Sequence, residues 1–127
     1  MKLDLKEWIA KVTGQTEFKT LLWTNTSPTT GFGAQTVQLD LSGYDDVEVE
    51  WIHNTNEQSK VLYNRCKVGK SSFLFVTRVD TFLTQMRQLD ANSNGIYFGA
   101  CQIGSNATIY NNHCIPYHIY GIRYVGG

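Results

Sequence analysis

From Thr16 onward, apolar and polar side chains alternate with a period of two, and this feature restricts the fold more than any other. In the segment 46–51, Val47, Val49 and Trp51 share one face and two glutamates occupy the opposite face. Such alternation is typical of half-buried β-strands, whereas a helix would repeat its apolar face every 3.6 residues. Strand-like patterns also occur at 35–41, 60–68, 72–79, 81–89, 96–103 and 114–125.

Turn signals separate these segments. Clusters of Gly, Asn, Asp and Ser occur at 42–45, 69–71 and 90–95, and the first is of the kind that joins antiparallel strands. About eight short strands at regular spacing predict an all-β domain at 16–127, a β-sandwich or a jelly-roll-like head. Aromatic side chains with apolar neighbours are expected in its core, namely Trp23, Phe73, Phe75, Phe82 and Phe98.

The first fifteen residues have a different pattern. Leu5, Trp8, Ile9 and Val12 fall at positions i, i+3, i+4 and i+7, which predicts a short amphipathic helix within 1–15. A helix this short does not persist alone in water, because nucleation is costly. Its apolar stripe approximates a coiled-coil seam, so we expect these residues to serve oligomerisation or attachment.

Charge and hydropathy exclude several classes of function. Eleven Lys and Arg balance eleven Asp and Glu, and charged residues make up only 17% of the chain. This argues against a nucleic-acid binder or a membrane-surface protein that depends on a basic field. No apolar run approaches the roughly 20 residues of a membrane span, and the N-terminus lacks the apolar core of a secretory signal. We therefore expect no membrane insertion and synthesis in the cytoplasm.

Metal and cofactor signals are weak. The three cysteines, Cys66, Cys101 and Cys114, have no CxxC spacing and are expected to be buried free thiols, with one disulfide plus a spare thiol as the alternative. The three histidines form no HExxH motif, and no glycine-rich segment has phosphate-loop spacing. The sequence predicts neither a metal site nor a cofactor.

Uncharged polar residues accompany many aromatics. The chain holds 36 Thr, Asn, Gln and Ser residues and 16 aromatic residues. A sugar ring presents apolar C–H faces and many hydroxyls, which suit an exposed aromatic ring beside amide side chains. The polar segment 104–113 is the best candidate of this kind. The candidate ligand-binding residues are Trp51, Tyr97, Tyr110, Asn111, Asn112 and His113.

Three stretches carry a family resemblance. The segments 22–25 and 32–45 resemble the opening of minor structural proteins in tailed phages and prophages of Gram-positive hosts, and 114–122 is similar to their C-terminus. The helix at 5–12 also looks like the N-terminus of small proteins encoded in such tail modules. The resemblance implies the β-sandwich head of a tail-fibre or receptor-binding protein. Such a head is homotrimeric, sits in the virion tail with other tail proteins and contacts the host wall. No site residue is carried over.

These observations predict a non-enzymatic tail adhesin that binds carbohydrate of the host cell surface. Three copies of a weak sugar site can gain affinity through simultaneous engagement. One alternative is a structural decoration or tail component of the virion with no ligand. A third reading is a wall hydrolase that uses Asp45 or Glu50. The alternation around Glu50 instead indicates an ordinary solvated strand face, which includes Glu48.

Overall fold

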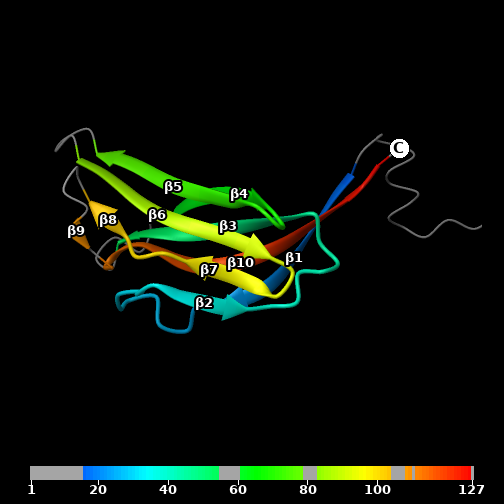
Figure 1. Ribbon diagram of the computed structural model, residues 1–127, viewed down its shortest axis with the longest axis horizontal. Helices are drawn as coiled ribbons and strands as arrows, with labels where there is room; N and C mark the ends of the chain where they lie inside the picture. Colours follow the sequence, from blue (N-terminus) through cyan, green and yellow to red (C-terminus); the bar gives the residue numbers. More distant parts are fainter. Residues whose placement is uncertain (1–15, 55–60, 79–82, 104–107, 110, 127) are drawn as a thin grey trace, which may run out of the picture.

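The computed structural model describes residues 16–54, 61–78, 83–103, 108–109 and 111–126, and these residues form an all-β fold (Figure 1). This confirms the predicted all-β class. The strands among these residues are β1 (Thr16–Thr24), β2 (Gln35–Gln38), β3 (Asp46–Asn54), β4 (Val61–Lys67), β5 (Ser71–Arg78), β6 (Leu83–Asn92), β7 (Gly95–Phe98), β8 (Gln102–Ile103), β9 (Thr108–Ile109) and β10 (His113–Val125). The expected helix with Leu5, Trp8, Ile9 and Val12 lies outside the described residues.

The first sheet is antiparallel and has the strand order β1-β10-β3-β4. Its long central strand β10 pairs with β1 on one side and with β3 on the other, so that Tyr120 lies between Leu21 and Glu48. The register brings Thr16 opposite Val125, and the start of β1 therefore lies beside the end of β10 (Figure 1). This sheet joins segments from both ends and the middle of the chain.

The second sheet is organised around β6. Strand β5 pairs along one edge of β6, while β7 and β8 pair one after the other along its opposite edge. Strand β2 then extends the sheet beside β7, and β9 extends it beside β8. The segment predicted as one strand at 96–103 is thus two strands, separated at 99–101 where the chain leaves the ladder.

One apolar core lies between the two sheets, as expected for a β-sandwich. Val47, Val49 and Trp51 of β3 point inward and are fully buried, which confirms the alternation seen in the sequence. The Trp51 ring meets Phe98 of the opposite sheet edge-to-face, with ring centroids 5.5 Å apart. Burying each large apolar side chain contributes about 1.5–3 kcal/mol, so this interface dominates the stability of the fold.

The turn signals are correctly located, but two of them connect the sheets instead of closing hairpins. The segment 42–45 leads from β2 in the second sheet to β3 in the first. The segment 68–70 leads back from β4 in the first sheet to β5 in the second. The turn between β6 and β7 does close a hairpin, where Gly95 has a φ of 151°. A Cβ at Gly95 would lie 2.3 Å from the carbonyl oxygen of Val37, so only glycine fits there.

The burial of Phe73 and Glu48 differs from what the sequence predicted. Phe73 is 42% exposed. Side chains along β5 point alternately inward and outward, and because Leu74 points into the core, its neighbour Phe73 points outward. Glu48, expected on a solvated face, is only 8% exposed, since Lys19 of β1 and Arg65 of β4 contact its carboxylate. Phe98 lies in the core as predicted, whereas Phe82 lies outside the described residues.

Candidate functional site

The sequence-predicted ligand residues do not converge on one site. Trp51 is fully buried in the core, so its assignment to an exposed sugar-stacking surface was wrong. It was placed there because polar residues follow it in sequence, but its inward position is set by the alternation of β3. Tyr97 is 38% exposed and adjoins Phe98, which faces the core, so it lies on the outer face of the second sheet.

The remaining predicted residues lie around the turn before β10. Asn111 and His113 are half-buried and Asn112 is exposed, while Tyr110 lies outside the described residues. The carbonyl oxygen of Asn111 accepts a hydrogen bond from the Phe32 backbone N–H at 2.9 Å. The Asn111 side chain also accepts one from the Cys101 N–H at 3.2 Å. This turn therefore supports the loop between β1 and β2, which was not among the segments expected to bind a ligand.

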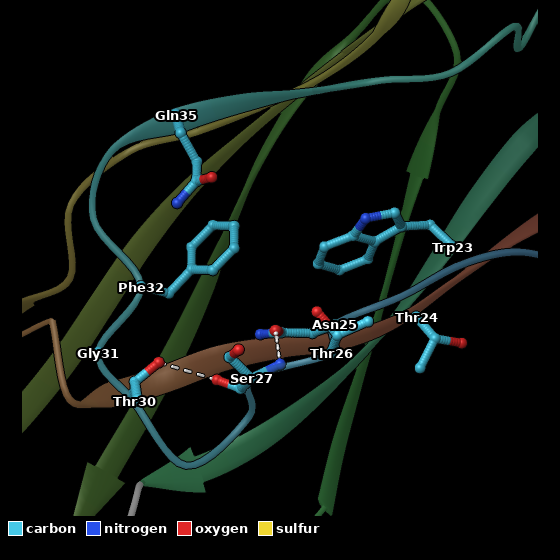
Figure 2. Close-up of a pocket in the computed structure, with 9 residues that line it drawn as sticks. All are labelled: Trp23, Thr24, Asn25, Thr26, Ser27, Thr30, Gly31, Phe32 and Gln35. Carbon is cyan, nitrogen blue, oxygen red and sulfur yellow. Dashed lines mark hydrogen bonds between the residues drawn. The ribbon is translucent and has the colours of Figure 1, made fainter.

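A pocket of about 330 Å³ opens at that loop (Figure 2). The nine residues that line it carry no ionisable side chain and combine two aromatic rings with hydroxyl and amide groups. They are Trp23, Thr24, Asn25, Thr26, Ser27, Thr30, Gly31, Phe32 and Gln35. In Figure 2 the Trp23 and Phe32 rings border one space, with Gln35 on one side of it and the turn residues Asn25, Ser27 and Thr30 on the other.

The aromatic wall depends on an irregularity in β1. The pairing register of β1 with β10 shifts between Leu21 and Trp23. Such a bulge changes which face a side chain points to, and here it turns Trp23 toward the interior side of the sheet. The Trp23 and Phe32 rings then meet edge-to-face, with centroids 6.3 Å apart. Phe32 continues the contact to Phe98 at 5.6 Å, which ties the pocket wall to the core.

The polar rim is held by hydrogen bonds within the turn. Asn25 is buried, and its Oδ1 accepts from the Ser27 N–H at 2.8 Å while its Nδ2 donates to the Pro116 carbonyl at 2.9 Å. The Thr30 hydroxyl donates to the Ser27 carbonyl at 3.0 Å (Figure 2). Asn side chains commonly stabilise turns in this manner. The rim is therefore shaped before any ligand arrives.

Behind the pocket, Arg87 of β6 is fully buried. Its Nη1 donates to the carbonyl oxygens of Phe32 and Gly99, both at 2.8 Å, and its Nη2 donates to the His113 carbonyl at 3.0 Å. These three carbonyls belong to the pocket loop, the link after β7 and the start of β10. Because one guanidinium joins all three segments, Arg87 fixes the position of the pocket loop relative to the turn around Asn111.

The carboxylates considered for hydrolysis have other contacts. Asp45 accepts a hydrogen bond from the Tyr124 backbone N–H at 2.8 Å. Glu50 lies 3.3 Å from Nδ1 of His118 on the outer side of the first sheet. Neither residue lines the pocket at Trp23. Among the described residues, no three His, Cys, Asp or Glu side chains gather as a metal ion would require.

The lining chemistry favours recognition of a neutral polar molecule. Aromatic faces stack on apolar C–H surfaces, and hydroxyl and amide groups both donate and accept hydrogen bonds. The signal for this site was present in the sequence as a Thr- and Ser-rich segment bounded by Trp23 and Phe32. Trp23 was expected in the core, whereas it is half-buried and packs against the core cluster from the edge.

None of the described segments forms a helix long and apolar enough to cross a membrane. A scan against protein-family models, a search of curated proteins and a search of solved structures each found no match to this chain.

Proposed function

We propose that this chain is the carbohydrate-binding head of a phage or prophage tail adhesin, and that the pocket at Trp23 and Phe32 binds a sugar of the host cell wall. The observation that carries the proposal is the uncharged, aromatic and hydroxyl-rich lining of that pocket. The resemblance of the segments 22–25, 32–45 and 114–122 to phage minor structural proteins supports the assignment to a tail. No chemical step is part of the proposed function.

The lining residues have complementary roles toward a sugar. A ring edge or C–H face packs against Trp23 and Phe32, whose apolar surface offsets the cost of removing water. Thr30 and Gln35 lie at the rim and are exposed, so their hydroxyl and amide groups can exchange water for sugar hydroxyls. Because no lining side chain is charged, the pocket suits a neutral sugar better than a phosphate-rich polymer.

Preorganisation lowers the cost of binding. The pocket loop is held by Asn25 at the Pro116 carbonyl, by the Asn111 carbonyl and by Arg87. A loop that is already ordered loses little conformational entropy when a ligand binds. An open site of about 330 Å³ nevertheless covers only part of a polysaccharide, so its affinity alone is expected to be weak, with a Kd on the order of 1 mM.

Trimerisation would compensate for weak individual sites. We propose that Leu5, Trp8, Ile9 and Val12 form a helical contact between three copies, as part of a tail that also contains other tail proteins. Linked sites gain about 10²–10⁴ in affinity when they engage together. Light scattering should therefore give three times the chain mass of 14.4 kDa. A monomer that persists at micromolar concentration would contradict this part of the proposal.

The carbohydrate site is tested with labelled protein on host cells and on purified wall polysaccharide. Gln35→Ala removes an exposed amide from the rim and is expected to weaken binding about tenfold, the effect of one lost hydrogen bond of about 1.4 kcal/mol. Trp23→Ala should abolish binding, because it removes the stacking surface. Circular dichroism checks that both variants keep the strand content of the wild type.

Tyr97→Ala is the matched control, since Tyr97 is an exposed aromatic residue on the outer face of the second sheet. It should bind like the wild type. If wild-type protein binds no wall fraction, or if Tyr97→Ala weakens binding as much as Gln35→Ala, the pocket assignment is wrong. Absence of binding to every fraction would favour a decoration protein without a ligand.

A further inference from the structure

Two buried thiols meet beneath the pocket loop. Cys101, which follows β7, and Cys114 of β10 are both fully buried, and each thiol shifts the pKa of the other. The carbonyl oxygens of the nearby residues Gly99 and His113 accept hydrogen bonds from one guanidinium, that of Arg87. Both cysteines belong to the apolar core cluster, although 12 residues separate them in sequence. Gln85 is also buried there, with its Oε1 3.8 Å from Sγ of Cys114. Two buried thiols that the fold holds in the same part of the core meet the first requirement for a disulfide.

The backbone at Cys114 is arranged to direct this thiol inward. Cys114 has a φ of 50°, the left-handed region that side chains other than glycine rarely adopt. Cys114 and its neighbour Ile115 are both in the core, whereas consecutive residues of a regular strand point to opposite faces. The unusual φ thus interrupts the alternation. Such conformations are unfavourable by about 1–2 kcal/mol and persist where the surrounding structure imposes them.

A buried cation adjoins the two thiols. Arg87 is fully buried, its hydrogen bonds go to backbone carbonyls, and its Nε has no hydrogen-bond partner. Buried charges in proteins are normally paired with an opposite charge. The interaction with Cys114 and the charge of Arg87 lower the pKa of Cys101 despite its burial, while the interaction with Cys101 and burial raise the pKa of Cys114. The two thiols therefore share this part of the core with the Arg87 guanidinium, which acts on the pKa of both.

We propose that Cys101 and Cys114 are a redox pair, with Cys101 as the reactive thiolate and Cys114 as the resolving thiol, which a peroxide converts to an intramolecular disulfide. The pair joins the link after β7 to the start of β10, and Asn111 lies between them in sequence. The disulfide would therefore fix the turn that supports the pocket loop. Oxidation of the two thiols does not depend on the carbohydrate site.

The chemistry balances with one peroxide molecule for each disulfide. The Cys101 thiolate attacks one oxygen of hydrogen peroxide, the O–O bond breaks, and the departing hydroxide takes a proton to become water. Cys101 is then a sulfenic acid. The Cys114 sulfur attacks the Cys101 sulfur, the S–O bond breaks, and the leaving hydroxide takes the Cys114 proton as a second water. Two thiols lose two hydrogens in total, and hydrogen peroxide is reduced to two molecules of water.

Cys66 provides an internal control. It is buried on β4, where its thiol donates to the carbonyl oxygens of Lys67 and Lys70 at 3.4 and 3.2 Å. Burial raises the pKa of Cys66 above its usual value, in contrast to Cys101. A protonated thiol held by backbone carbonyls is a poor nucleophile. We therefore expect Cys66 to remain a thiol under conditions that oxidise the pair.

The experiment counts thiols in the full-length protein. The reduced folded chain is treated with hydrogen peroxide, the peroxide is removed with catalase, and the chain is unfolded and alkylated for intact mass measurement. Untreated wild type should take up three alkyl groups and treated wild type one, with a Cys101–Cys114 peptide found after digestion. Dithiothreitol should restore all three. Cys66→Ser should fall from two alkyl groups to none.

Single-cysteine variants and an unfolded control distinguish a pairing set by the fold from random oxidation. Cys101→Ala and Cys114→Ala should each keep Cys66 free and form no intramolecular disulfide, with folding checked by circular dichroism. Peroxide treatment of wild type unfolded in urea should give mixed pairings, because the fold no longer brings Cys101 to Cys114. Three free thiols after treatment of the folded protein, a bridge that includes Cys66, or only disulfide-linked dimers would overturn the proposal. Peptide mapping of wild type decides the matter even if a variant does not fold.

Discussion

Two arginines in different regions of the sandwich have opposite surroundings. Arg65 lies on the outer face of the β1-β10-β3-β4 sheet, where its guanidinium donates to both oxygens of Glu17 at 2.6 Å and to Glu48 at 3.2 Å. Its side chain is 38% exposed. Arg87 is fully buried in the second sheet, and its three hydrogen bonds go to backbone carbonyls. The first arginine has carboxylate partners and contact with solvent, whereas the second is held by neutral acceptors inside the fold.

The comparison shows that an arginine paired with carboxylates at the surface and an arginine that joins buried backbone segments contribute differently to stability. An exposed ion pair contributes little to stability, because water competes for both charges and the long side chains lose entropy. A buried guanidinium is costly to remove from water, so it persists only where several acceptors are placed around it. Arg87 donates hydrogen bonds to three backbone carbonyls, each in a different segment of the chain. The residue with fewer charged partners is therefore expected to matter more for the fold and for the pocket.

The largest effect is expected from Arg87→Met. Methionine keeps much of the side-chain volume but leaves the carbonyls of Phe32, Gly99 and His113 without their buried donor. Each unsatisfied buried acceptor costs about 1–3 kcal/mol, so the free energy of unfolding should fall by about 3 kcal/mol or more. Urea unfolding followed by circular dichroism measures the change. Arg87→Lys should recover little, since one ammonium cannot reproduce the planar fork of donors.

Arg65→Met is the matched substitution on the outer face. It removes hydrogen bonds to two carboxylates but exposes both to water, so the free energy of unfolding should fall by about 1 kcal/mol or less. Equal losses for Arg65→Met and Arg87→Met would contradict the contrast between the two regions. A loss below about 1 kcal/mol for Arg87→Met would show that water replaces the guanidinium at its three carbonyls.

Much of the sandwich was predictable because its core follows a short-range rule. The alternation of Val47, Val49 and Trp51 identified the buried face of β3, and the turn at 42–45 was located correctly. The pairing of strands was not predictable, because it depends on contacts between distant segments such as β1 and β10. The burial of Glu48 had the same cause, since the residues that cover it lie on other strands.

The candidate site was less predictable than the fold. Asn111 and Asn112 were selected for their polarity, and the structure places them beside the pocket loop as support. Trp23 was assigned to the core because of its apolar neighbours in sequence, and the bulge that places it at the pocket wall has no local sequence signature. Arg87 was not singled out at all, because an arginine in an alternating strand looks like a solvated residue until its partners are known.

A smaller effect is expected from Asn111→Ala, which tests whether the turn before β10 supports the pocket. The substitution removes the side-chain acceptor of the Cys101 N–H but leaves the Asn111 carbonyl bond to Phe32. The loss of this partly buried bond should cost about 1 kcal/mol in urea unfolding. Asn112→Ala, at the exposed neighbouring position, should cost less. The reverse order would mean that Asn111 contributes no more than a surface residue.

The smallest effect concerns pH and is confined to the outer face. Burial raises the pKa of Glu48, but hydrogen bonds from Lys19 and Arg65 lower it more, so the folded value lies below the usual 4.5. A hydrogen bond from Arg65 likewise lowers the pKa of Glu17. A carboxylate with a lowered folded pKa stabilises the fold above its unfolded pKa, and this contribution is lost as the pH falls through the folded pKa.

The Tm should therefore decrease as the pH falls below about 4.5, and the decrease should be shallower in Glu48→Gln than in wild type. Thermal unfolding at a series of acidic pH values measures both slopes. Arg87 should not contribute to this slope, because its hydrogen-bond partners are carbonyls that do not titrate. A Glu48→Gln slope equal to that of wild type would mean that carboxylates outside the Lys19–Glu48–Arg65 cluster govern the acid response. Because a salt-screened surface network weakens at high ionic strength, added salt should also reduce the difference between the two proteins.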